Sequence, residues 1–372
     1  MRVLMISKAM VNGVYQRKAE ELAKLPNTDL CLVVPPYWHE NRVGDQRLEL
    51  MFTEGYELAV EPMRFNGRHH LHYYPGLGRL MRAFKPDIVH IDEEPYNFVT
   101  AHATRLARRV RAKTVFFAWQ NLYRRYPPPF RLFELYNYRA ASAAIVGNRD
   151  AGWVLRNKRY RGPIAVIPQF GVDPEIFHPP AKLRPSFDNP VIGYIGRMVE
   201  EKGVDLLVDA VARIQPRPTV RIIGAGDQRV ELELRAERLG IRDRIRFEGA
   251  MPPARVPEVL RQLDILVLPS RTRSNWKEQF GRILIEAMAC EVAVVGSDSG
   301  EIPNVIGDAG IVFPEGDVES LAVALRGLVL DPEALRATQQ AGRKRVLEEF
   351  TQAQVAHQTW QLYRRILDGD RQ

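Results

Sequence analysis

The sequence predicts an α/β protein with two doubly wound, Rossmann-like domains. First, the chain has 372 residues, roughly two to three times the length of an ordinary domain. Second, short apolar runs rich in Val and Ile alternate with amphipathic stretches, as in parallel sheets joined by right-handed helical crossovers. Third, residues 173–190 interrupt this alternation with five prolines and no periodicity, which is typical of an interdomain linker.

Twelve segments have the pattern of strands buried on both faces, because each is a short apolar run bounded by Gly, Pro or Asp. These segments are residues 3–7, 30–36, 87–92, 114–121, 143–148, 164–168, 191–197, 220–227, 245–251, 265–270, 292–300 and 310–314. Residues 204–214 are typical of the intervening helices, since their apolar side chains recur at helical spacing. Residues 352–367 form a further helical pattern near the end of the chain.

These elements predict where the domains begin and end. We expect an N-terminal domain at 1–172, a linker at 173–189 and a C-terminal domain at 190–354, with a helix at 355–372 packing back on the first domain. The two domains are expected to face a central cleft. Because ligands of open α/β sheets bind at the carboxyl ends of the strands, the polar residues that follow each strand are the candidates for function.

Composition excludes several classes of protein. Hydrophobic residues make up 45% of the chain and charged residues 26%, which excludes a disordered or collagen-like protein. No run approaches the roughly 18 apolar residues of a transmembrane helix, and MRVLMISKAM lacks the apolar core of a signal peptide. Cys31 and Cys290 are too few for a disulfide framework or a zinc site. We expect both to be buried thiols in a reducing cytoplasm.

Positive charge is concentrated in the first half of the chain. Residues 1–180 carry 26 Lys/Arg against 17 Asp/Glu, and the remaining residues carry 27 against 28. This asymmetry indicates an anionic partner for the first half, such as a phosphate-bearing substrate or a lipid surface. The alternative is an arginine-rich composition without a specific partner, since Arg outnumbers Lys 43 to 10.

One group of candidate functional residues lies in KEQFGRILIEAMA, residues 277–289. A turn at Gly281 and a helix from about Arg282 would leave Glu278 before the helix and Glu286 within it. The free N–H groups at the start of such a helix form a natural site for a phosphate. In a purely structural alternative, Glu278 is solvated and Glu286 pairs with an arginine.

A second group lies in GYIGRMVEEKGVDLLVDA, residues 193–210. Arg197 follows a predicted strand, and Lys202 precedes a predicted helix. Two cations on a strand-to-helix loop can clamp a diphosphate, Arg through its planar fork and Lys as a point charge. The alternative is a surface ion pair between Arg197 and Glu200 or Glu201.

In chain order, the motifs GR-x4-KG, IIGAGD, GAMPPARVPEVL, LPS, E-x7-E and SDSGEIPNVIGDAG resemble the carboxyl-terminal domain of the retaining GT-B glycosyltransferases of family four. The resemblance covers residues 190–345 closely. It covers the first 180 residues more loosely, through a glycine loop and through IPQFGVDPEIFHP, which is similar to the family's IPNGVD-x3-F-x-P. It implies GT-B architecture and transfer of a hexosyl group, with retention, from a UDP- or GDP-sugar to a cell-envelope, lipid-linked or polysaccharide acceptor.

Carried over position by position, the resemblance implies a site for the nucleotide-sugar donor. Arg197 and Lys202 would bind the diphosphate and stabilise the charge that develops on it. Glu286 would hold the ribose hydroxyls, and Glu278 would contact the transferred sugar. The other residues implied in donor binding are Gly13, Met251, Phe280, Gly281, Arg282 and Ile283.

The N-terminal half departs from the family pattern in two places. Asn12-Gly13 occupies the loop where relatives usually have two adjacent glycines that close over the phosphates. Gln120, in FAWQN, lies where many members have a histidine near the donor sugar. A glutamine forms hydrogen bonds but cannot act as an acid or base near neutral pH, so Gln120 stays a candidate catalytic residue in a different role. His90, in DIVHID, is either a strand-end replacement for that histidine or a structural residue.

We expect no metal ion and no cofactor. Metal-dependent glycosyltransferases use an Asp-x-Asp at a strand end, and the one such triplet, 368–370, lies at the end of the chain. Cations of the 197–202 loop would take the metal's role. His69, His70 and His72 are close in sequence, but no carboxylate or Cys lies at ligand spacing from them.

Residues 121–139, NLYRRYPPPFRLFELYNYR, interleave aromatic side chains with arginines. Such a segment can bind anionic lipid headgroups, which fits a carbohydrate or lipid-linked acceptor and peripheral contact of a cytoplasmic protein with the inner face of a membrane. The alternative is a packed loop and helix with solvated arginines. We expect no nucleic-acid partner, because no recognised binding module accompanies the basic composition.

Three other functions stay open. One is another GT-B activity, such as a phosphorylase or a sugar-nucleotide hydrolase. Another is a non-catalytic nucleotide-sugar binding protein, and the third is a peripheral membrane scaffold protein. Dinucleotide binding is disfavoured, because Gly224-x-Gly226 lacks the third glycine of that motif.

Overall fold

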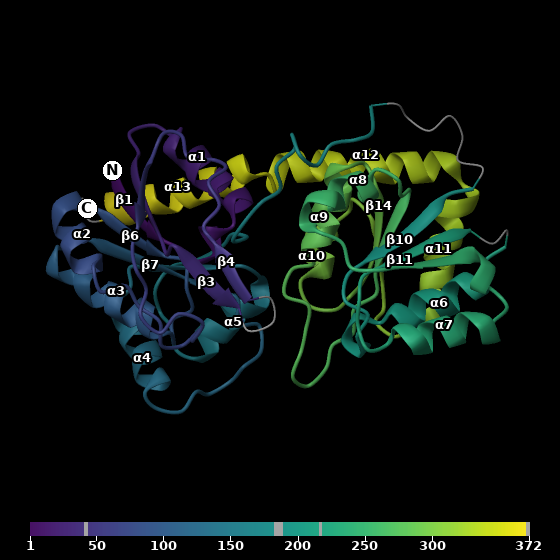
Figure 1. The fold of residues 1–372 in the computed structure, drawn as a ribbon, viewed down its shortest axis with the longest axis horizontal. Coiled ribbons are helices and arrows are strands. Elements are labelled where there is room, and N and C mark those ends of the chain that lie inside the picture. Colours follow the sequence, from purple (N-terminus) through teal and green to yellow (C-terminus); the bar gives the residue numbers. More distant parts are fainter. Residues whose placement is uncertain (41–43, 182–188, 216–217, 370–372) are drawn as a thin grey trace. The chain divides into compact units, whose positions relative to one another are not determined.

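The computed structural model describes residues 1–40, 44–181, 189–215 and 218–369 (Figure 1). The chain divides into two compact units, which are Met1–Gly171 with Gln352–Gln372, and Val172–Thr351. We call them unit 1 and unit 2. The sequence placed this boundary one residue later, and it placed the start of the returning C-terminal helix three residues later. Residues 182–188 of the expected linker lie outside the described residues.

Unit 1 is built on a seven-stranded parallel sheet with the order β5-β2-β1-β6-β7-β8-β9. Its strands are β1 (Arg2–Ile6), β2 (Asp29–Val34), β5 (Glu57–Val60), β6 (Ile88–Ile91), β7 (Lys113–Ala118), β8 (Ala143–Val146) and β9 (Ile164–Val166). All six strands expected in this half are present. The sequence analysis missed β5 and the antiparallel pair β3 (Tyr37–Glu40) and β4 (Gly44–Arg47), because their mixed, partly exposed residues lack an apolar run.

Helices cover both faces of the unit 1 sheet. They are α1 (Arg17–Ala23), α2 (Leu77–Phe84), α3 (Phe98–Arg109), α4 (Phe130–Ala140), α5 (Arg149–Asn157) and α13 (Gln352–Asp368). Helices α1 and α13 share one hydrophobic cluster with the sheet, through residues such as Leu22 and Tyr363. Helices α2 and α3 share a separate cluster with alternate strand residues, through Met81 and Ala103. Burial on both faces explains why the strands are continuous apolar runs.

Unit 2 contains a six-stranded parallel sheet with the order β12-β11-β10-β13-β14-β15. Its strands are β10 (Val191–Ile195), β11 (Thr219–Ile223), β12 (Ile245–Glu248), β13 (Ile265–Leu268), β14 (Ala293–Ser297) and β15 (Ile311–Phe313). Each was expected from the sequence. The helices are α6 (Val204–Ala212), α7 (Arg229–Arg238), α8 (Val256–Leu260), α9 (Arg282–Ala289), α10 (Ile302–Ile306), α11 (Val318–Leu330) and α12 (Pro332–Glu349). Figure 1 shows α9 and α10 on the opposite side of this sheet from α6 and α7.

Two further features bear on the expectations from composition. None of the described helices combines the length and apolar character needed to cross a membrane. Cys31 and Cys290 are buried free thiols, and burial raises the pKa of each to about 12. They are therefore packing residues rather than reactive nucleophiles.

Candidate functional site

The strand order of unit 2 reverses between β10 and β13, which are neighbours in its sheet. In doubly wound sheets, ligands bind outside the carboxyl ends of the strands at such a switch point. The loop that follows β10 carries Arg197 and Lys202, and the loop that follows β13 carries Glu278. The two clusters predicted from the sequence therefore belong to the same switch point.

Lys202 and Glu278 form an ion pair at this switch point. The Lys202 Nζ lies 2.6 Å from Glu278 Oε2, and the Ser270 hydroxyl donates to the same oxygen at 2.9 Å. The Lys202 Nζ also lies 4.9 Å from the centroid of the Trp276 ring. The Glu278 side chain is 10% exposed and that of Lys202 17%. The alternative in which Glu278 is solvated is therefore wrong, and the pair is held in a mostly dry setting that strengthens its electrostatic attraction.

Two glycines allow the loops of this site to approach one another. Gly203 has φ +63°, and a Cβ there would lie 2.1 Å from the Pro269 carbonyl oxygen of the loop after β13. Gly300, after β14, has φ +61°, and its Cβ would lie 2.0 Å from the Glu278 carbonyl oxygen. Any larger residue would force these backbones apart. Both glycines therefore fix the position of the Lys202–Glu278 pair.

Arg197 is the more accessible of the two predicted cations. Its side chain is 53% exposed, and a guanidinium nitrogen lies 3.4 Å from Glu201 Oε1. This is the surface ion pair considered from the sequence. Such a pair contributes little to stability, so the arginine can be drawn away by a stronger anion at small cost.

Helix α9 begins at Arg282, as predicted, and Gly281 precedes it with φ +79°. Within the helix, Arg282 Nε donates to Glu286 Oε1 at 2.8 Å. Burial raises the pKa of Glu286, and the positive charge of Arg282 partly opposes that rise. The Arg-paired alternative for Glu286 is thus the one present in the structure.

The remaining donor-site candidates in unit 2 lie at the start of α9 and after β12. Phe280 is buried, and its ring meets that of Phe350 edge to face with centroids 6.0 Å apart. Ile283 is half-buried on α9. Met251 is half-buried in the segment after β12.

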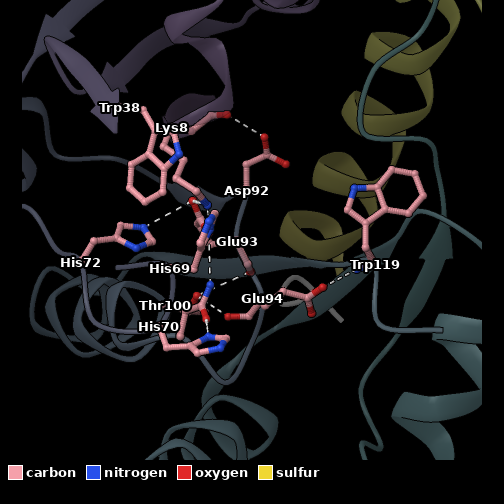
Figure 2. Close-up of polar contacts among 12 residues, drawn as sticks. Lys8, Trp38, His69, His70, His72, Asp92, Glu93, Glu94, Thr100 and Trp119 are labelled. Atoms are coloured by element: carbon pink, nitrogen blue, oxygen red, sulfur yellow. Dashed lines mark hydrogen bonds and ion pairs between the residues drawn. The ribbon is translucent and has the colours of Figure 1, made fainter. Parts of the chain in front are cut away.

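Unit 1 has its own switch point, between β1 and β6. The residues after β1 are Ser7 and Lys8, and those after β6 begin with Asp92 and Glu93. Figure 2 shows Lys8 and Asp92–Glu94 gathered at this point. The Ser7 hydroxyl donates to Asp92 Oδ2 at 2.7 Å, and Lys8 Nζ lies 2.5 and 2.6 Å from the two Glu93 carboxylate oxygens. Sequence analysis missed this cluster, although three consecutive acids directly after a buried strand are a usable signal.

Glu93 is the centre of the cluster and is almost fully buried. His72 Nε2 lies 3.5 Å from Glu93 Oε1, and the Asn97 amide donates to Glu93 Oε2 at 3.2 Å. Burial alone would raise the pKa of Glu93, but Lys8 and His72 outweigh it and bring the pKa down to about 2. The carboxylate is therefore charged at any physiological pH.

The neighbouring histidines bind side chains that sequence spacing did not associate with them. His72 meets Glu93 (Figure 2). His70 Nδ1 lies 2.9 Å from Asn97 Oδ1, and His69 Nε2 lies 3.9 Å from Glu40 Oε2. Within the described ranges, no group of three or more His, Cys, Asp or Glu side chains could hold a metal ion.

Glu94 and Gln120 occupy the next positions along this edge of the sheet. The Trp119 N–H donates to Glu94 Oε1 at 2.8 Å. Burial, reinforced by the nearby charge of Glu93, raises the pKa of Glu94 to about 7, so this carboxyl can exchange a proton near neutral pH. The Gln120 side chain donates to the Leu122 carbonyl at 3.1 Å and accepts from Lys158 Nζ at 2.9 Å. Its amide is thus engaged within unit 1.

His90 does not lie at a strand end. It lies within β6, is fully buried, and its Nδ1 is 2.5 Å from the Tyr363 hydroxyl of α13. Burial lowers the pKa of His90 well below its usual value, so the ring is neutral. Of the two alternatives left open by the sequence, His90 is the structural residue.

Gly13 begins a short 3₁₀ helix, Gly13–Gln16, in the loop after β1. Its N–H donates to Glu49 Oε2 at 3.1 Å, and a Cβ at this position would lie 2.4 Å from Met51 Cγ. A side chain at this position would therefore have to displace the exposed Met51 side chain.

Comparison with known proteins shows which class of enzymes the chain is similar to. Residues 180–345 match the family model described as Glycosyl transferases group 1. The chain is 30% identical over 257 residues to the alpha-maltose-1-phosphate synthase of Mycolicibacterium smegmatis, covering 61% of this chain and 64% of that protein. It is 30% identical over 205 residues to the GDP-mannose-dependent alpha-(1-6)-phosphatidylinositol monomannoside mannosyltransferase of the same organism, covering 51% and 54%. Among solved structures, the sucrose-phosphate synthase from Thermosynechococcus elongatus has a TM-score of 0.69 at 18% identity, covering 99% of this chain and 100% of that one.

The fold and the family model agree. The chain has the GT-B fold of two Rossmann-like units, and residues 180–345, most of unit 2, are similar to the group 1 glycosyltransferases. The fold class and the resemblance stated from the sequence are thereby confirmed. The chain spans about half to two thirds of the length of the curated relatives just named.

Proposed function

We propose that this protein is a retaining glycosyltransferase that moves a hexosyl group from a UDP- or GDP-sugar to a cell-envelope, lipid-linked or polysaccharide acceptor. The observation that carries the proposal is the Lys202–Glu278 pair. It lies at the switch point of the domain that matches the group 1 glycosyltransferases. A half-buried lysine held in place by a carboxylate is suited to receive a diphosphate.

In this proposal Lys202 and Arg197 bind the donor diphosphate. When the bond between the anomeric carbon and the diphosphate oxygen breaks, its electron pair goes to that oxygen. An acceptor hydroxyl oxygen forms the new bond to the same face of the anomeric carbon, and its proton goes to the released diphosphate. Fixed cations stabilise the charge that develops there, without the reorganisation that water would need. Glu278 orients Lys202 and accepts hydrogen bonds from the transferred sugar, and Glu286 accepts hydrogen bonds from the ribose hydroxyls. We propose this reaction without a metal ion or cofactor.

The names of two relatives support the proposed classes of donor and acceptor. The name of one relative specifies GDP-mannose as donor and a phosphatidylinositol monomannoside as acceptor, and that of the other specifies a sugar phosphate as product. These names favour a nucleotide-sugar donor and an acceptor that carries a phosphate or a lipid. We accordingly propose a cytoplasmic protein with peripheral contact at the inner face of the membrane.

The donor is tested by thermal stability of the protein against UDP, GDP, ADP and their common sugar conjugates. At 100 times its dissociation constant, a ligand adds about 2.7 kcal/mol to the free energy of unfolding, which is readily seen as a higher melting temperature. One nucleotide series should stabilise the protein, and Lys202→Ala should remove the effect. Lys344→Ala, an exposed lysine of the same unit, is the matched control. Absence of a shift with every nucleotide would contradict the proposal.

A further inference from the structure

Unit 1 contains a strongly basic pocket of about 760 Å³ that the proposed donor chemistry does not use. Its size falls within the roughly 300–1,000 Å³ typical of small-molecule sites. Six of its lining residues are cations, and none of the lining residues is acidic. The six are Arg125, Arg131, Arg139, Lys158, Arg159 and Arg161.

Three segments of the chain build this pocket, and the first is the loop before α4, which supplies Tyr123 and Arg125. Arg131, Leu135 and Arg139 are four residues apart on α4, so they line one face of that helix. The turn that follows α5, residues 158–161, supplies the other wall. The surrounding sequence is unusually basic, since residues 101–161 hold 14 Lys/Arg and two Asp/Glu.

One of those two acids, Glu134, lies beneath the pocket and is already matched. It is fully buried, and its Oε1 lies 2.6 Å from Lys158 Nζ and accepts from the Tyr138 hydroxyl at 3.0 Å. Arg131 pairs with the other carboxylate oxygen. Two cations thus share one negative charge, and the pocket keeps an excess of positive charge.

The remaining arginines are free to take a ligand. Arg139, Arg159 and Arg161 are exposed and have no ion-pair partner in the part of the chain that the structure describes. The positive field is also evident at Tyr123 on the rim. A hydrogen bond from Arg125, with the charges of Arg125, Arg131 and Lys158, lowers the pKa of the Tyr123 phenol.

Cations gathered around a hollow repel one another, and an anion with several oxygens relieves that repulsion. Guanidinium groups match the geometry of phosphate oxygens through paired, charge-assisted hydrogen bonds. We propose that this pocket is a binding site for a phosphate-bearing group. The group comes either from a soluble phosphorylated compound or from a phospholipid headgroup, since the recognition chemistry is the same. This site does not rest on the proposed transferase activity, because the Lys202–Glu278 site belongs to unit 2.

The test uses the double variant Arg139→Ala/Arg161→Ala and the control Arg108→Ala/Arg109→Ala. The control removes the same charge from exposed arginines of α3 that do not line the pocket. Every protein also carries Arg197→Ala, so that the proposed donor site contributes little to phosphate binding. One arm measures affinity for inorganic phosphate by thermal shift. The other measures sedimentation with vesicles of phosphatidylglycerol and phosphatidylcholine in equal parts, against pure phosphatidylcholine.

We expect the pocket variant to lose at least about tenfold in affinity in one arm or both, since each lost charge-assisted hydrogen bond is worth about 1.5–3 kcal/mol. A loss for inorganic phosphate alone assigns the site to a soluble ligand. A loss that extends to anionic vesicles assigns it to a phospholipid headgroup. Equal behaviour of the pocket and control variants in both arms would overturn the proposal. Nucleotide binding by the variants with Arg197 restored reports separately on the proposed donor site.

Discussion

The switch points of the two units contain the same kinds of side chain. In unit 1, Lys8 pairs with Glu93 and lies 5.3 Å from the Trp38 ring centroid. In unit 2, Lys202 pairs with Glu278 and lies 4.9 Å from the Trp276 ring centroid. A serine hydroxyl donates to a carboxylate at each point. Both lysines follow the first strand of a doubly wound sheet, and both acids follow its fourth parallel strand.

The surroundings of the two pairs differ. Glu93 is also bound by His72 and Asn97, and its side chain is 3% exposed. The Glu278 side chain is more accessible, at 10% exposed. The family model covers the Lys202–Glu278 pair but not Lys8–Glu93. The comparison teaches that the same topology can bury the acid of one pair in a closed structural network and leave the acid of its counterpart more exposed.

The largest effect is expected at the closed pair. Lys8→Ala removes the main partner of a buried carboxylate, and breaking such a pair costs about 3–5 kcal/mol. The free energy of unfolding from urea titration should fall by that amount. Lys24→Ala, which breaks an exposed pair with Glu21, should cost less than about 1 kcal/mol. Equal losses in the two variants would mean that the Lys8–Glu93 pair is not structural.

Lys202→Ala is expected to act on catalysis rather than on stability. Loss of one fixed cation from a developing charge costs about 100- to 1,000-fold in rate. Transfer of sugar from the cognate donor, measured at saturating acceptor, should fall by that factor. The exposed Lys344→Ala variant should retain the wild-type rate. A Lys202→Ala enzyme with full activity would show that the two switch points do not differ in function.

Glu94, next to the unit 1 pair, should make the stability of the protein depend on pH. Its pKa is raised from 4.5 to about 7 in the folded protein, so the folded state holds the proton more tightly than the unfolded state. The contribution to stability is greatest below about pH 4.5 and is lost as pH rises to about 7, a fall of roughly 2–3 kcal/mol. Glu94→Gln should remove that part of the pH dependence of the urea midpoint. If the pH dependence of the urea midpoint were unchanged in Glu94→Gln, the Glu94 carboxyl would have its ordinary pKa in the folded protein.

The smallest effect is expected at the tryptophans. Trp276→Leu keeps an apolar neighbour but removes the interaction of Lys202 with the aromatic ring, worth about 0.5–2 kcal/mol. Donor affinity should weaken by a few-fold in Trp276→Leu. Trp38→Leu should lower stability by a similar free energy and leave donor affinity unchanged. Isothermal titration of donor with both variants distinguishes the two outcomes.

The sequence alone determined the fold and the unit 2 candidates. Short apolar runs buried on both faces predicted twelve strands, and the structure contains all twelve, because burial leaves a strong local pattern. The loop glycines and the turn before α9 are likewise local features, so they placed Arg197, Lys202 and Glu278 at strand ends. The missed elements, β3 to β5, are short and partly exposed and leave no such pattern.

Only the tertiary structure decided which of these side chains meet. Lys202 and Glu278 are 76 residues apart, and Lys8 and Glu93 are 85 apart. Each pair depends on the order of strands in a sheet, which no local pattern records. The same holds for His90, whose structural role follows from contact with a helix 273 residues away. Periodicity follows from burial of each segment by itself, whereas the partner of a polar side chain depends on the packing of the whole unit.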